Sequence, residues 1–164
     1  IEIYRDVPSN EWQFEPNGDI VMGTSEMDYA AVIEANHNRP FDGMPKDTII
    51  GHMHLSVIDL NQSIAFYNEL FGLDVMTRYG SQAAFIATAG YHHHLGLNTW
   101  QHQTERARLD YPGLRKFDLN IPNEEDLQHF LETLSEKGLT QSKDENSNII
   151  YDPSGIGIRI MTKN

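Results

Sequence analysis

The chain has 164 residues, of which 39% are hydrophobic and 22% are charged, a balance typical of a globular protein with one well-buried domain. It contains no cysteine, which excludes disulfide bonds and thiolate metal ligands, so any bound metal must use histidine or carboxylate side chains. The formal net charge of -12 argues against a nucleic acid partner, because phosphate groups are bound by clustered lysine and arginine.

Residues 1–47 are expected to hold the end of one structural module and a connector with one helix. Ile1-Glu2-Ile3-Tyr4 alternates like a β-strand, and we interpret it as the last strand of a preceding module, with a processed N-terminus as the alternative. The stretch that follows is interrupted by prolines and glycines, and Ser25 is a suitable N-cap for a helix over residues 26–36. We expect no chemistry from this connector.

The rest of the chain, residues 48–164, contains an internal repeat, with one module over residues 48–100 and a second over residues 114–162. Each module opens with a strand that leads into a helix. Three extended segments follow each helix, over residues 74–79, 83–88 and 91–99 in the first module and 139–143, 149–151 and 156–161 in the second.

The two helices have clear boundary signals. The first begins after Asp59 and ends at Gly72, and the second begins after Asn123 and ends at Gly138. Aspartate and asparagine accept hydrogen bonds from free amides at a helix start, and glycine adopts the left-handed turn that ends a helix. Each module therefore has the order βαβββ. We predict an α+β fold in which paired βαβββ modules form a curved, cup-shaped mixed sheet with the helices outside.

The alternation of side chains along a strand predicts which residues face the cup. In the opening strand Met53, Leu55 and Val57 are apolar and are expected to lie under the helix. Their neighbours then point into the cup, and the same argument applies to the other strands. The residues expected to face the cup are His52, His54, Ser56, His92, His94, Gly96, Asn98, Lys116, Asp118, Asn120, Arg159 and Met161.

Residues 51–60, 64–67 and 70–73 resemble the opening of a module of the vicinal-oxygen-chelate superfamily, which includes glyoxalase, bleomycin resistance proteins and extradiol dioxygenases. Residues 90–100 resemble the C-terminal half of tandem catechol-2,3-dioxygenase-like proteins of Gram-positive bacteria. The Asp-Pro-Ser-Gly turn at 152–155 and the strand at 1–6 are similar to that family as well. The resemblance implies the glyoxalase fold and a bacterial, metal-dependent protein.

The resemblance also implies a ligand set. Dioxygenases of this superfamily bind their metal with a histidine on the opening strand of each module and a glutamate on a last strand. His52 matches the first position, whereas Lys116 and Arg159 stand at the other two. Two cations would repel a divalent metal and favour an anion instead. The two modules, paired in order, are therefore expected to hold an incomplete metal site.

Two arrangements would restore a metal site. In one, the missing N-terminal half carries the metal, with Glu2 as its carboxylate ligand. In the other, modules pair out of order, so that Glu2 and His52 share a site with a histidine from the missing part, and His94 acts as the acid/base that deprotonates a catechol. Fe(II) is the first choice of metal, with Mn(II), Zn(II) or no metal in this half as alternatives.

Simpler interpretations stay open beside these. One alternative is that His52 and His54 form hydrogen bonds within the sheet and bind no metal. Another is that the run from His92 to His94 lies on the surface and binds metal only adventitiously.

Three functions follow from these observations. The first is the C-terminal domain of an extradiol, ring-cleaving oxidoreductase that requires its N-terminal half. The second is a catalytically incomplete domain that binds a small aromatic or anionic compound through His54, Asn98, Lys116 and Arg159. The third, a glyoxalase-like lyase, ranks last because it needs two carboxylates at the metal and the chain supplies at most Glu2. We expect no membrane partner, since no apolar run approaches the roughly 20 residues that span a bilayer. The lack of cysteine fits a cytoplasmic protein, and we expect a homo-oligomer because unpaired strand edges favour association.

Overall fold

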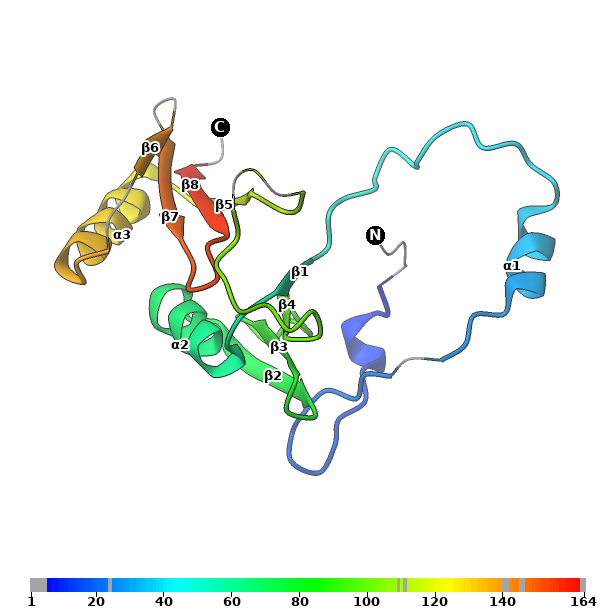
Figure 1. Ribbon diagram of the computed structural model, residues 1–164. Coiled ribbons are helices and arrows are strands. Elements are labelled where there is room, and N and C mark those ends of the chain that lie inside the picture. Colours follow the sequence, from blue (N-terminus) through cyan, green and yellow to red (C-terminus); the bar gives the residue numbers. More distant parts are fainter. Residues whose placement is uncertain are drawn as a thin grey trace.

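The computed structural model describes residues 6–23, 25–108, 110, 112–139, 142–144 and 147–162. A 3-10 helix (Ser9–Glu11) and α1 (Tyr29–Asn36) precede the first module. The first module consists of β1 (Met53–Ser56), α2 (Leu60–Phe71), β2 (Asp74–Tyr79), β3 (Ala83–Ala87) and β4 (Leu95–Asn98). The second consists of β5 (Lys116–Ile121), α3 (Glu124–Glu136), β6 (Ser142–Asp144), β7 (Ser147–Tyr151) and β8 (Gly157–Thr162) (Figure 1).

The two modules have the same topology. The strand order is β1-β4-β3-β2 in the first sheet and β5-β8-β7-β6 in the second. In each sheet the opening strand is parallel to the last strand, and the other neighbours are antiparallel. The prediction of an α+β fold with paired βαβββ modules is confirmed. Within the described residues the strands form two separate hydrogen-bonded sheets, and no continuous hydrogen-bond ladder runs through both. A shared apolar core joins the two sheets.

The helices of the modules begin where their capping residues predict. The Asp59 carboxylate accepts a hydrogen bond from the Gln62 amide at 2.8 Å, and Gly72 ends α2 with a φ of 63°. Asn123 caps α3 in the same way, through the Asp126 amide at 2.9 Å. The connector helix differs from its prediction, because it starts at Tyr29 and is capped by Asp28. A carboxylate accepts the helix amides more strongly than the hydroxyl of Ser25 would.

One strand is shorter than its sequence pattern suggests. The extended segment predicted over residues 91–99 contains only the four residues of β4. Ala89 and Gly90 have positive φ values of 55° and 71°, and the Tyr91 amide donates to the Thr88 carbonyl at 3.2 Å. The chain therefore turns before β4, and the three consecutive histidines lie in that turn instead of on a strand.

A common apolar core holds the modules together. The rings of Phe71 in α2 and Phe130 in α3 stack with centroids 5.3 Å apart. The fully buried members of the core include Leu55, Val57, Tyr67, Ile86, Leu97, Leu134, Ile150, Ile158 and Ile160. Burial of this apolar surface, worth about 25 cal/mol per Å², is what joins the two sheets.

Polar groups in the turn at residues 152–155 also join the modules. Asp152 is fully buried, and its side chain accepts hydrogen bonds from the Tyr67 hydroxyl at 3.0 Å and from the amides of Ser154 and Ile156. The Ser154 hydroxyl accepts from the Ile58 amide at 3.0 Å, just after β1. The turn of the second module is thus bonded to α2 and to the segment that follows β1 in the first.

The connector reaches away from the sheets and returns to the first module (Figure 1). Helix α1 has no buried residue, but Trp12 contacts the rings of Tyr91 and His92 at centroid distances of 6.2 and 5.4 Å. The Tyr91 hydroxyl donates to Asp6 at 3.0 Å. Among the described helices, none is both long and apolar enough to cross a membrane.

Candidate metal centre

Four histidines from two segments of the first module gather at one end of its sheet. His52 and His54 belong to the segment that enters β1, and His92 and His93 belong to the turn before β4. Because β1 and β4 pair in parallel, with Met53 opposite Leu95, the residues that precede the two strands lie at the same end of the sheet.

Three of these histidines have the geometry of a ligand set. His52, His92 and His93 each offer one ring nitrogen, and these atoms lie within 4.8 Å of one another. The Nε2 atoms of His52 and His92 are 3.2 Å apart. Nitrogen ligands at about 2.1 Å from one ion lie about 3 to 3.4 Å from each other. Small side-chain adjustments would therefore let all three nitrogens bind a single metal ion.

The protonation of these rings suits a metal. Burial, followed by the charges of His52, His92, His54 and His94, lowers the pKa of His93 from 6.5 to about 3. The pKa of His92 is also lowered, mainly by burial, although Asp6 opposes the shift. Both rings are consequently neutral near pH 7, the form in which imidazole binds metals.

The donor set fits a divalent transition metal. The Nδ1 atoms of His92 and His93 are buried without a hydrogen-bond partner in the part of the chain that the structure describes, so these rings hold polar atoms that protein contacts leave unsatisfied. Imidazole groups suit zinc, iron, copper and nickel better than they suit magnesium or calcium. We therefore regard this three-histidine cluster (His52, His92 and His93) as a candidate metal centre.

His54 lies beside the cluster and is positioned by a glycine. Its Nε2 is 3.4 Å from the Nε2 of His93, and its ring packs on Gly96, the residue opposite it in the β1–β4 pair. A Cβ atom at position 96 would lie 3.1 Å from Cδ2 of His54, which is closer than an ordinary contact. The glycine thus provides the space for this ring, next to the edge of Phe85.

His94, which we expected to act as acid/base, is placed differently. Its Nδ1 accepts a hydrogen bond from the Thr88 amide at 3.3 Å. Its side chain lines a mainly apolar cavity of about 530 Å³ between the two modules, with residues of α2, α3 and β5. Burial lowers its pKa. His94 contributes no atom to the three-histidine cluster, whereas His93, which strand alternation put on the apolar face, does.

The other predicted site residues do not line the cluster. Arg159 donates twice to Asp118, at 2.7 and 2.6 Å, and this pairing lowers the pKa of Asp118. Lys116 lies nearby on β5 and adds to that shift. The side-chain oxygen of Asn98 accepts from the Trp100 amide at 3.3 Å. Glu2, the expected carboxylate ligand, lies outside the described residues.

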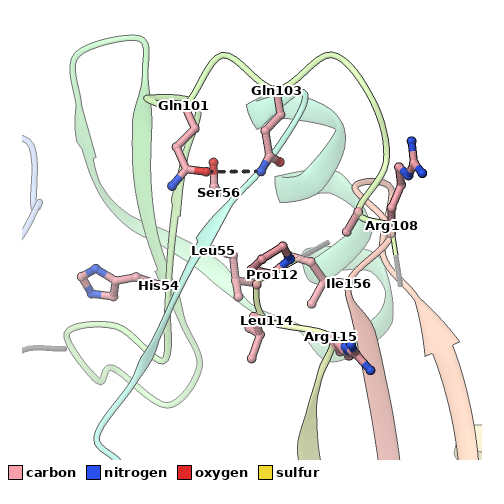
Figure 2. Close-up of a pocket in the computed structure, with 13 residues that line it drawn as sticks. His54, Leu55, Ser56, Gln101, Gln103, Arg108, Pro112, Leu114, Arg115 and Ile156 are labelled. Carbon is pink, nitrogen blue, oxygen red and sulfur yellow. Dashed lines mark hydrogen bonds between the residues drawn. The ribbon is translucent and has the colours of Figure 1, made fainter. Parts of the chain in front are cut away.

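A cavity of about 310 Å³ opens next to His54, between the first module and the start of the second (Figure 2). The side chains of Gln101 and Gln103, joined by a hydrogen bond of 3.4 Å, stand over Ser56 at one end of it. The complete lining is His54, Leu55, Ser56, Gln101, Gln103, Ala107, Arg108, Pro112, Gly113, Leu114, Arg115, Gly155 and Ile156. Much of this wall comes from residues 101–113 between the modules, for which sequence analysis found no motif.

Known proteins share this fold. Residues 49–160 match the family model of the "Glyoxalase/Bleomycin resistance protein/Dioxygenase superfamily". The chain is 35% identical over 155 residues to a catechol-2,3-dioxygenase of Bacillus subtilis (strain 168), covering 93% of this chain and 54% of the relative. The chain thus spans about half the length of that curated relative.

Solved structures agree on the fold. A putative glyoxalase from Bacillus halodurans superimposes with a TM-score of 0.59 and 18% identity, over 71% of this chain and 97% of the other. A lactoylglutathione lyase from Agrobacterium tumefaciens gives a TM-score of 0.53 at 18% identity, over 71% and 94% of the two chains. At this level of identity the likeness concerns the fold alone.

Proposed function

Because the chain belongs to the glyoxalase/bleomycin resistance protein/dioxygenase superfamily, we propose that it is the C-terminal part of a metal-dependent extradiol dioxygenase. The observation that carries this proposal is the cluster of three imidazoles whose ligand nitrogens lie within 4.8 Å of one another, adjacent to a cavity through His54. The curated relative named for catechol cleavage supports the same reaction class. The protein would be a cytoplasmic bacterial enzyme that works with its N-terminal half and assembles into a homo-oligomer.

The proposed reaction joins a catechol and O2. The ring bond beside the diol breaks, both oxygen atoms enter the product, and no external reductant is required. A bound divalent metal would supply Lewis acidity toward the two diol oxygens and O2. His52, His92 and His93 would hold that metal, and Glu2 remains proposed as an additional carboxylate ligand. We propose Fe(II), because oxygen chemistry needs a redox-active ion.

The same proposal needs a group that takes a proton from the diol. His54 is the better candidate than His94, because it lines the cavity and lies 3.4 Å from His93. An imidazole near neutral pH is suited to accept and return a proton. His94 instead bonds to the Thr88 amide and lines the other cavity.

The first experiment measures metal in the untagged chain, produced in cells grown with iron, beside two single variants. We expect near-stoichiometric iron in the parent chain, loss of it in His93→Ala, and retention of it in His94→Ala. The comparison of these two variants distinguishes metal binding by the three-histidine cluster from nonspecific binding by the whole run from His92 to His94. Metal that survives His93→Ala would contradict the ligand assignment.

Oxygen uptake with catechol, measured on the full-length protein, tests the reaction. We expect uptake that requires iron and disappears in His93→Ala. A full-length protein that binds iron but consumes no oxygen with catechols would overturn extradiol cleavage, and would reopen glyoxalase-like metal chemistry.

A binding domain without catalysis is the second candidate. It is favoured by the second module, where Lys116 and the paired Arg159 and Asp118 occupy strands β5 and β8. This function predicts a chain without stoichiometric metal that still binds a small aromatic or anionic compound. The metal measurement above therefore distinguishes the two candidates.

A further inference from the structure

A second cavity lies between α2 and α3, apart from the cavity beside His54. Its volume is about 530 Å³, and none of its lining residues lines the other cavity. Its walls come from α2 and the start of β4 in the first module and from β5 and α3 in the second (Figure 1). The histidines of the three-histidine cluster do not line it. It is therefore separate from the site at which the chemistry is proposed.

The apolar lining of this second cavity is recessed. Leu73, Leu95 and Ile158 are buried, and Phe71 and Phe130 are half-buried. None of the leucine, isoleucine and phenylalanine residues that line it is among the exposed large hydrophobic residues of the described chain. A protein partner docks on apolar side chains that protrude, whereas a small molecule enters a recess of roughly 300–1,000 Å³. The shape therefore favours a small molecule over the N-terminal half or a second copy of the chain.

The chemistry of the walls favours an uncharged aromatic compound. Among the described residues that line the cavity, none is a lysine, arginine, aspartate or glutamate, so a charged ligand would lose hydration without gaining an ion pair. The ring of Phe71 lies 5.3 Å from that of Phe130 and 6.1 Å from that of Tyr67, between centroids. Such rings attract a further aromatic ring in offset or edge-on geometry.

One polar side chain at the cavity, His94, has a fixed hydrogen-bonding role. Its Nδ1 accepts a hydrogen bond from the Thr88 amide at 3.3 Å, which places the ring proton on Nε2 and makes that atom a donor. His94 is exposed where it lines the cavity, so a ligand has access to it. The Tyr67 hydroxyl is already used, because it donates to Asp152. The group that this cavity recognises is therefore an oxygen that accepts a hydrogen bond from His94.

We propose that the cavity between α2 and α3 binds an uncharged two-ring aromatic compound that carries one acceptor oxygen. The rings pack between the two helices, and the oxygen accepts a hydrogen bond from Nε2 of His94. The size agrees, because an apolar cavity of roughly 150 Å³ accepts benzene and this one measures about 530 Å³. This inference is independent of the proposed dioxygenase function, since it uses neither the metal nor the cavity beside His54.

The test uses two probes of the same shape, 2-acetylnaphthalene and 2-ethylnaphthalene, of which only the ketone has an acceptor oxygen. Their affinities are measured by equilibrium dialysis at pH 7, on the parent chain and on His94→Phe, which keeps a ring but removes the donor. We expect both probes to bind the parent. In His94→Phe the affinity of the ketone should fall about fivefold, the loss that one neutral hydrogen bond causes, while the affinity of the hydrocarbon stays within about twofold.

Two matched substitutions locate the probes. Leu70→Trp places a larger side chain at the cavity between α2 and α3, and Leu114→Trp does the same at the cavity beside His54. We expect Leu70→Trp to weaken both probes by about tenfold or more, and Leu114→Trp to change neither. His52→Ala, which removes a proposed metal ligand, should bind both probes like the parent. Circular dichroism establishes that each variant is folded, and if Leu70→Trp is not, the comparison of the two probes in His94→Phe decides.

Several results would overturn this inference. They are no measurable binding of either probe, an equal change for both probes in His94→Phe, or loss of binding in Leu114→Trp but not in Leu70→Trp. Binding to this chain that is absent from the full-length protein would assign the cavity to a contact with the N-terminal half. The two proposals fail separately, because a chain that binds the probes but no iron would keep this site and remove the dioxygenase function.

Discussion

At the scale of single residues, the burial of His93 has a consequence for stability. Its exposed fraction is only 6%, and its pKa of about 3 lies below the ordinary 6.5. Between these values the unfolded chain binds a proton that the folded chain does not. The stability that the folded chain has from keeping His93 neutral is therefore complete above pH 6.5, and it is lost as the pH falls toward 3.

Chemical denaturation of the metal-free chain at pH 7 and pH 5 checks this prediction. We expect the parent to lose more stability between the two pH values than His93→Phe, while His102→Asn, a change in an exposed loop, keeps the parental slope. The slope from one proton is at most about 1.4 kcal/mol per pH unit, and solvent screening reduces it. Identical slopes for the parent and His93→Phe would contradict the assignment of a low pKa to His93.

Gly96 sets the position of His54 and offers a second prediction. In Gly96→Ala the new methyl group would press on the His54 ring at 3.1 Å, so the ring must move by a few tenths of an ångström. We expect a loss of about 1 kcal/mol in unfolding free energy, with metal content unchanged and a lower rate of oxygen uptake. Loss of metal together with activity would show that His54 acts through the three-histidine cluster and not beside it.

At the scale of elements, the turn at residues 152–155 connects the modules through a buried carboxylate. Burial raises the pKa of Asp152, although its hydrogen bonds with the turn amides and with Tyr67 oppose the shift. Burial and the nearby Asp152 also raise the pKa of Tyr67, so that the hydroxyl remains a donor. The contact between Tyr67 and Asp152 is therefore one hydrogen bond, which connects α2 with the turn before β8.

Tyr67→Phe removes that donor and leaves a carboxylate oxygen buried without its partner. We expect a decrease of about 1–3 kcal/mol in unfolding free energy, measured by urea denaturation. Tyr79→Phe is the control, because Tyr79 is 62% exposed, and it should change stability by less than about 0.5 kcal/mol. Equal effects of the two substitutions would show that the buried pair does not connect the modules energetically.

At the scale of the whole molecule, metal binding is expected to stabilise the fold. The ligands come from two segments that meet only when β1 pairs with β4, so the unfolded chain does not hold them together. Free metal at about 100 times its Kd would add about 2.7 kcal/mol to the stability of the folded state. Thermal unfolding with added Fe(II) or Zn(II) should show a higher Tm in the parent and in His94→Ala. No increase is expected in His93→Ala, and a rise of the same size there would place the binding elsewhere.

The sequence alone determined the fold class and the helices of the two modules, because these depend on local signals. Apolar periodicity and the caps Asp59, Gly72 and Asn123 act within a few residues of one another, and the structure has them where they were predicted. The repeat of those signals predicted the paired βαβββ topology for the same reason.

Only the tertiary structure decided which histidines meet. Alternation assigns faces correctly inside a strand, but the left-handed turn at Ala89 and Gly90 delays β4 until Leu95, so His93 joins His52 while His94 turns to the other cavity. The parallel pairing of β1 with β4 brings together residues some 40 positions apart, as His52 and His92 are. Such contacts depend on chain reversals and strand register, which no local pattern of residues specifies.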